Sequence, residues 1–199
     1  MDRTGVTKPH VYLRESIDWA RWEVFFADER YVGLDDKESN YHACNEELFR
    51  HVPIPADHIH TIDVSAKVES KLGRGGKALP QFDLILLGMG PDGHTCSLFP
   101  FHALLKEDQL LVAPISDSPK PPPERITFTL PLVNAARNVA FVVTGDAKKN
   151  VLFNILEGKE EKEGELPSKH VWPTEGGLYW FVDQPAASLL QVYVASCNL

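Results

Sequence analysis

The stretch that decides the fold is residues 82–100, FDLILLGMGPDGHTCSLFP. Its apolar run Leu84–Leu87 stops at Gly88, and Gly90, Asp92 and His94 follow closely. This pattern predicts a buried parallel strand that ends in a tight turn holding a carboxylate and an imidazole. Open α/β sheets bind their ligands at the carboxyl ends of the strands. An Asp and a His at such a place have the chemistry to activate water at neutral pH.

Strand and helix patterns alternate along the rest of the chain. Alternation of this kind predicts an α/β fold: a doubly wound, mostly parallel, Rossmann-like sheet with helices on both faces, in one domain over residues 1–199. We expect strands over residues 22–26, 58–62, 84–87, 110–113, 125–130, 138–144 and 177–182. We expect helices over residues 39–50, 64–72, 132–136, 149–156 and 185–190, the first capped by Ser39, and a charged surface loop over 158–169.

Composition limits the classes of partner. The 199 residues carry a formal net charge of −8, which argues against a nucleic acid or an anionic membrane as partner. A local cluster of Arg and Lys could still bind a small anion. No apolar run approaches the roughly 20 residues of a membrane span. The three cysteines are widely spaced and fit reduced thiols, so we expect a cytoplasmic protein.

Polar clusters follow three of the expected strands. They are residues 28–30 (Asp-Glu-Arg), residues 92–94 (Asp-Gly-His) and residues 145–148 (Gly-Asp-Ala-Lys). The carboxyl ends of parallel strands share one edge of a sheet, so these clusters could line one crevice, with Arg125 near it. One imidazole, several carboxylates and several cations suit an anionic substrate and a proton transfer.

His94 is the main candidate for a catalytic base, and Asp92 could orient its ring. The alternatives are a structural histidine and an ordinary Pro-Asp-Gly turn. Gly90 and Gly93 would let the backbone approach a ligand. Lys148, before a helix, could contact a phosphate or be solvated.

Other polar groups favour structural interpretations. Cys96 is better explained as a small buried residue than as a nucleophile. Asp92, His94 and Cys96 are too cramped for a metal site, and we expect none. Residues 73–77 precede a strand and so do not fit a phosphate loop. We expect no acidic companion for His58 and His60, which are two residues apart and indicate a loop surface.

Five segments together resemble a known family. They are FADER (26–30), ESNY (38–41), GMGPDGHTCSLFP (88–100), APISDSPKPPPERI (113–126) and TGDAK (144–148). From about Trp22 to the C-terminus the chain is similar to the glucosamine-6-phosphate isomerase/6-phosphogluconolactonase family. The TCSLFP continuation of the central turn resembles the lactonase branch more than the isomerase/deaminase branch.

The resemblance implies hydrolysis of 6-phosphogluconolactone to 6-phosphogluconate in the oxidative pentose phosphate pathway, without metal or cofactor. In that function His94 would take a proton from water and Asp92 would place His94. Arg30, Arg125 and Lys148 would hold the phosphate and neighbouring oxygens, and Asp28 matches an acidic position of the relatives. The partner would be a small phosphorylated sugar lactone, bound by a monomer.

Two departures from the family pattern are visible. Relatives begin with a further βα unit whose Gly/Ser-rich loop cradles the phosphate, and no such loop precedes Trp22. The segment from Ile62 to Phe82 also looks shortened. We therefore expect an N-terminally truncated sheet with exposed apolar edges. The alternatives to an active lactonase are a homologue that only binds sugar phosphate and an isomerase/deaminase-like enzyme.

Overall fold

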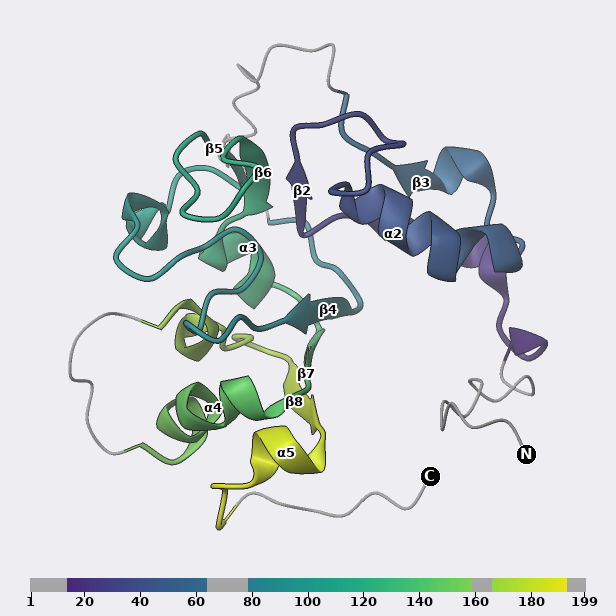
Figure 1. Ribbon diagram of the computed structural model, residues 1–199. Coiled ribbons are helices and arrows are strands. Elements are labelled where there is room, and N and C mark those ends of the chain that lie inside the picture. The colour runs from purple at the N-terminus through teal and green to yellow at the C-terminus, as the bar shows by residue number, and fades with distance from the viewer. Residues whose placement is uncertain (1–13, 64–78, 159–165, 193–199) are drawn as a thin grey trace. The chain divides into compact units, whose positions relative to one another are not determined.

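A computed structural model describes residues 14–63, 79–158 and 166–192 (Figure 1). The chain divides into two compact units: Met1–Phe26 with Val32–Val64, and Ala27–Tyr31 with Ser65–Leu199. The single domain over 1–199 stays a prediction. The expected helix over 64–72, the Gly-rich residues 73–77 and Cys197 lie outside the described residues.

The first unit is built around one helix and a small parallel sheet. Its elements are η1 (Trp19–Arg21), β1 (Val24–Phe25), α2 (Asn40–Glu47), η2 (Phe49–His51), η3 (Ala56–His58) and β3 (Ile59–His60). β1 pairs with β3 in parallel. The predicted cap is confirmed, because the Ser39 hydroxyl accepts a hydrogen bond from the His42 N–H at 3.2 Å. Phe49 is buried and packs edge-on against Phe26.

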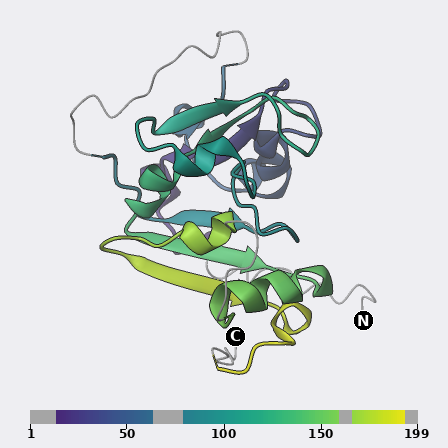
Figure 2. The same ribbon diagram turned by 90° about the vertical axis from the view of Figure 1, so that its left-hand side faces the viewer.

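The second unit contains the predicted parallel sheet. Its strands are β4 (Ile85–Gly88), β7 (Asn138–Val143) and β8 (Gly177–Val182), in the order β4-β7-β8. The helices α3 (Leu130–Asn134), α4 (Lys149–Leu156) and α5 (Gln184–Ala187) contribute buried side chains to the same core as the odd-numbered residues of β4 and β7. Figure 2 shows the three strands side by side, with α4 and α5 beside them.

The opposite face of this sheet is exposed. Leu86 is 64% exposed and its neighbour Leu87 only 4%, since successive side chains point to opposite faces of a strand. Val142 and Phe181 continue the exposed face on β7 and β8. The prediction that the whole run Leu84–Leu87 is buried is therefore wrong. In the part of the chain that the structure describes, α3, α4 and α5 all pack on one side.

A second sheet in this unit is antiparallel, which the expectation of mostly parallel pairing missed. It consists of β2 (Asp28–Arg30), β6 (Arg125–Phe128) and β5 (Val112–Ile115), in the order β2-β6-β5. Residues 28–30 are thus a strand, not a turn after one, and Glu29 is only 1% exposed. Pairing with the distant β6 gives this charged segment backbone partners that its own pattern does not reveal.

The end of the expected surface loop is also ordered and buried. Pro167–His170 forms η6, in which Pro167 and Ser168 are buried. Ser168 donates hydrogen bonds from its N–H (3.0 Å) and its hydroxyl (2.9 Å) to the Gly93 carbonyl, so this segment braces the turn after β4. Across the described ranges, no helix has the length and apolar character needed to cross a membrane.

The two faces of β4 can be compared with one pair of variants. Leu87→Ala should cost about 2–5 kcal/mol of unfolding free energy, because it leaves a cavity in the core. Leu86→Ala should cost less than about 1 kcal/mol, since an exposed side chain gains little from packing. Chemical denaturation measures both. Equal losses would show that the Leu86 face is covered in solution.

Candidate active site

The turn after β4 is closed by its own backbone. Gly90 N–H donates to the His94 carbonyl at 2.9 Å, and Gly93 N–H donates to the Gly90 carbonyl at 3.0 Å. The Thr95 hydroxyl donates back to the carbonyl of Gly88 at 2.8 Å. Gly93 has φ +82°, a conformation that a side chain would strain. These bonds present Asp92 and His94 at the carboxyl end of the strand, as predicted.

Gly90 is required for a steric reason. A β-carbon at this position would overlap the His94 ring and crowd the Asp92 carboxylate. The imidazole therefore lies directly against the Gly90 backbone. The sequence predicted a close approach at Gly90 by a ligand, whereas the group that makes it in this structure is the catalytic candidate itself.

His94 and Asp92 form the central pair. His94 Nδ1 lies 2.5 Å from Asp92 Oδ1. An ionised carboxylate can only accept a hydrogen bond, so Nδ1 carries a proton, and in the neutral ring Nε2 keeps its lone pair. The ring stacks on Phe99 with the centroids 4.8 Å apart. This arrangement orients the imidazole, so that in its neutral form Nε2 is the nitrogen available to act as a general base.

Lys120 is a member of the site that the sequence analysis missed. Its Nζ lies 3.1 Å from His94 Nδ1 and 3.4 Å from Asp92 Oδ1. Periodicity carries no information about this residue, because it stands in an irregular loop before Pro121–Pro123. The available signal was the SPKPPP segment itself, which contributed to the family resemblance, but no role was assigned to its lysine.

Burial and charge hold both partners in their active forms. Burial lowers the pKa of His94 and the Lys120 charge lowers it further, against the raising effects of Asp92 and Asp28, so the pKa lies below its ordinary 6.5. Burial alone would raise the pKa of Asp92. The hydrogen bond and charge of His94, together with Lys120, outweigh that effect and leave it below its ordinary value. At neutral pH the pair is therefore imidazole and carboxylate.

Asp28 reaches this site from β2. Its Oδ2 accepts a hydrogen bond of 2.8 Å from the hydroxyl of Ser97, which is fully buried. The negative charge of Asp28 acts on both His94 and Cys96. The structure therefore joins two of the predicted polar clusters, residues 28–30 and 92–94.

Arg30 and Arg125 lie directly opposite each other in the antiparallel ladder. Paired residues project from the same face, and two like charges there repel unless an anion or other acceptors compensate. Arg125 is buried and donates to three carbonyls, those of Lys120, Pro121 and Pro122. These bonds use the Nε and Nη2 groups of its guanidinium, and the phosphate contact that the family resemblance implies for Arg125 stays a prediction.

Lys148 ends η5 (Asp146–Lys148), just after β7. Because β7 is the parallel neighbour of β4, this turn and the Asp92–His94 turn share one edge of the sheet. No hydrogen bond or ion pair joins Lys148 to His94 in the described ranges. Its phosphate contact stays a prediction.

The remaining candidates have structural surroundings. Burial raises the pKa of the Cys96 thiol and the nearby Asp28 raises it further, which disfavours the reactive thiolate and agrees with a structural interpretation of this residue. His58 and His60 do have an acidic companion: Glu23 lies 3.6 Å and 2.7 Å from them, across β1 and β3. Among residues 14–63, 79–158 and 166–192, no group of three or more His, Cys, Asp or Glu side chains has the geometry of a metal site.

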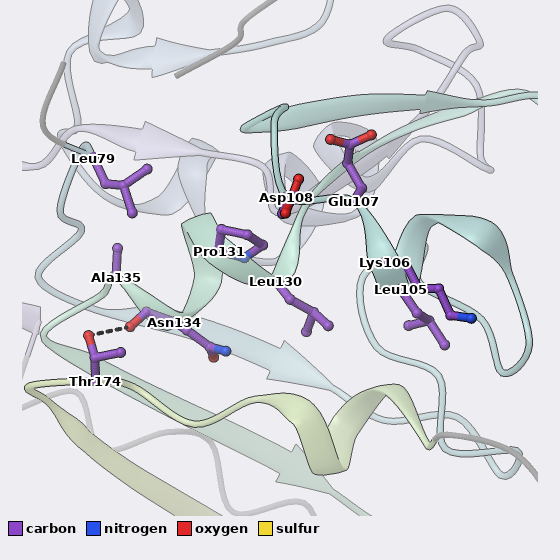
Figure 3. A pocket seen from close by; sticks show the side chains of 10 residues that line it. All are labelled: Leu79, Leu105, Lys106, Glu107, Asp108, Leu130, Pro131, Asn134, Ala135 and Thr174. Atoms are coloured by element: carbon purple, nitrogen blue, oxygen red, sulfur yellow. Dashed lines mark hydrogen bonds between the residues drawn. The ribbon is translucent and has the colours of Figure 1, made fainter. Parts of the chain in front are cut away.

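A pocket of about 440 Å³ lies elsewhere in the second unit (Figure 3). One polar group of its wall, the Asn134 side chain, already has hydrogen-bond partners. The Asn134 amide donates to the His170 carbonyl and accepts from the Trp172 N–H, and the Asn134 carbonyl accepts from the Thr174 hydroxyl. The pocket is lined by Leu79, Leu105, Lys106, Glu107, Asp108, Leu130, Pro131, Asn134, Ala135 and Thr174. It holds none of the predicted site residues, so the turn after β4 is the better candidate.

Comparison with known proteins agrees with the geometry. The family model of glucosamine-6-phosphate isomerases/6-phosphogluconolactonase matches residues 6–180. The chain belongs to this family. It is 50% identical to human 6-phosphogluconolactonase over 182 residues, which are 87% of this chain and 70% of that protein.

Solved structures of the family support the fold. A 6-phosphogluconolactonase from Thermotoga maritima superimposes with a TM-score of 0.71 at 33% identity, over 86% of this chain and 78% of the other. The enzyme from Trypanosoma brucei gives 0.69 at 30% identity, over 85% and 74%. The predicted α/β fold class and the resemblance stated from the motifs are both confirmed.

The glycine against the imidazole provides a test of the site geometry. Gly90→Ala should destabilise the protein by about 1–3 kcal/mol, because the methyl group forces the His94 ring to move. Gly88→Ala is the matched control, since a β-carbon there meets nothing within 4 Å. Denaturation measures stability, and the imidazole NMR signal of His94 reports its surroundings. Unchanged signals in both variants would contradict this position of the ring.

Proposed function

We propose that this chain hydrolyses 6-phospho-D-glucono-1,5-lactone to 6-phosphogluconate, the lactone hydrolysis of the oxidative pentose phosphate pathway. The observation that carries the proposal is the hydrogen bond from His94 Nδ1 to Asp92, which leaves Nε2 as a base at the carboxyl end of β4. Support comes from relatives named 6-phosphogluconolactonase that are about half identical to this chain.

The reaction follows from that pair. His94 Nε2 takes a proton from water while the water oxygen bonds to the ester carbonyl carbon. The resulting tetrahedral intermediate breaks its bond to the ring oxygen, and the proton on His94 passes to that oxygen as it leaves. The product is an open-chain acid with a new hydroxyl group. Asp92 stabilises the imidazolium that exists between the two transfers.

The chemistry demands little more of the protein. A lactone is already an activated acyl compound, so general-base assistance of about 10²–10⁴-fold can suffice without a covalent nucleophile. This agrees with a Cys96 thiol whose pKa is raised by burial. The mechanism needs no metal ion and no cofactor.

Cations around the pair suit the phosphate of the substrate. Lys120 stands beside His94, and Arg30 faces Arg125, so an anion near these groups would relieve the repulsion between like charges. In this proposal Arg30, Lys120 and Lys148 attract the phosphate, and Asp28 and the Gly90 backbone border the sugar. The three cysteines are widely spaced in the sequence and fit reduced thiols, which supports work in the cytoplasm. We infer a monomer.

Removing the base tests the mechanism. His94→Gln should lower lactonase kcat/KM by about 10²–10⁴-fold, once the spontaneous hydrolysis of the lactone has been subtracted from both rates. His102→Gln is the matched control, because His102 forms a similar pair with Asp117 (3.0 Å) in the same unit. Release of acid from freshly prepared lactone, followed at constant pH, measures both.

Other outcomes decide between functions. Equal rates for wild type and His94→Gln would remove His94 from the mechanism. Binding of 6-phosphogluconate in calorimetry without turnover by the wild type would favour a protein that only binds sugar phosphate. Ammonia release from glucosamine 6-phosphate would favour the isomerase/deaminase reaction.

The pH dependence has a definite sign. Only the neutral imidazole is a base, so kcat/KM should fall on the acid side with a pKa below 6.5. Asp92→Asn removes a carboxylate that favours the imidazolium. The acid limb should therefore move to lower pH, while the plateau falls because the tautomer is no longer held. A limb that moves to higher pH in Asp92→Asn would contradict this electrostatic role of Asp92.

A further inference from the structure

The position of Lys120 depends on backbone bonds of its own loop. The Ser118 hydroxyl donates to the Lys120 carbonyl at 2.8 Å and accepts from the Lys120 N–H at 3.2 Å. The Ser118 N–H donates to the Pro123 carbonyl at 3.2 Å, which closes the loop. Both backbone polar groups of Lys120 are therefore held by one side chain.

The loop of three prolines after Lys120 lacks hydrogen-bond donors, and Arg125 supplies them. Proline has no N–H, so Pro121–Pro123 offer no donors to hold the loop, while their carbonyls still need partners. Arg125 Nη2 donates to the Lys120 (2.8 Å) and Pro121 (3.0 Å) carbonyls, and Nε donates to Pro122 (2.9 Å). One rigid guanidinium thus binds three successive carbonyls.

The Arg125 guanidinium is itself fixed from the other side. Its Nη1 lies 3.4 Å from the Ser97 hydroxyl, and its Cζ lies 5.8 Å from the centre of the Phe99 ring. Phe99 also stacks on His94, and Ser97 also holds Asp28. The residue that binds the loop is therefore anchored to the same segment that carries His94.

We propose that Arg125 and Ser118 are positioning residues, which hold the Lys120 ammonium beside the Asp92–His94 pair and so keep the catalytic imidazole neutral. This rests on the proposed function for its catalytic meaning, but the placement of Lys120 stands on its own. A lysine side chain is long and flexible, and an anchored backbone lowers the conformational entropy cost of holding Nζ at a defined position.

The charge balance at His94 explains why the position matters. The charged groups acting on the ring are Asp92 on its own turn, Asp28 on β2 and Lys120 on the loop before β6. Two of the three are negative and favour the imidazolium. Lys120 is the cation that opposes them, and its effect falls with distance. Releasing the loop should therefore raise the pKa of His94, with burial still opposing the two carboxylates.

The experiment is an NMR titration of the His94 imidazole in the full chain, with His94→Gln to assign the signal. Lys120→Met should raise the pKa of His94. Ser118→Ala and Arg125→Lys should raise it in the same direction, although the first alters no charge and the second keeps its charge. In the double variant Ser118→Ala/Lys120→Met the rise should be no larger than in Lys120→Met alone.

Matched controls are available in the chain. Ser39→Ala removes a serine–backbone hydrogen bond from the cap of α2, and Arg137→Lys alters an arginine that pairs with Asp83. Neither should move the pKa of His94. If Arg125→Lys fails to fold, Ser118→Ala carries the test alone, since it is the smaller change.

Two results would overturn the proposal: an unchanged His94 pKa in Ser118→Ala, or a rise that persists when Lys120 is already Met. The lactone assay on the same samples separates this idea from the proposed function. If the wild type shows no turnover but the His94 pKa rises in the variants as described, the lactonase activity is refuted and the positioning roles stand. If the wild type shows turnover but the His94 pKa does not rise in the variants, the positioning roles are refuted and the lactonase activity stands.

Discussion

The hydrogen bond between His94 and Asp92 sets the chemistry of this site, and most of the surrounding structure serves to maintain it. The bond requires the two side chains to turn toward each other two residues apart, over a backbone too close for a β-carbon at Gly90. A strand that stops at Gly88 and a turn closed by its own N–H groups provide that geometry. Ser168 then fixes the turn from a segment distant in the sequence.

The ionisation of the pair is a balance of opposing effects. Burial disfavours charge on the imidazole, whereas two carboxylates favour it, and the Lys120 cation opposes the carboxylates. A base for work at neutral pH needs its pKa near or below that pH, yet still needs a carboxylate to orient it. A cation beside the Asp–His pair reconciles the two needs: the orienting bond is kept while part of its effect on the pKa is offset.

Sequence patterns predicted the parts of the fold whose signals are local. β7, β8 and α4 are found where alternation or helical periodicity indicated them, and the turn carrying Asp92 and His94 was visible as an apolar run cut short by glycine. What failed depends on contacts distant in sequence. Residues 28–30 look like a charged turn, but pairing with β6 makes them a strand. The exposure of Leu86 depends on which face of the sheet the helices cover, and the sequence of a single strand carries no information about that.

The same distinction explains the site residues. His94 and Asp92 could be found because both stand in one short turn. Arg125 was found as a residue, and its phosphate-binding role stays a prediction. The positioning role proposed for it rests on buried bonds to three carbonyls, which no sequence pattern shows. Lys120 had no periodic signal at all. Its position depends on a loop whose prolines have no N–H donors, and on Arg125 of the antiparallel strand β6, which supplies donors to the loop carbonyls. In this molecule the reactive pair is encoded locally, whereas the group that tunes it is placed by long-range pairing.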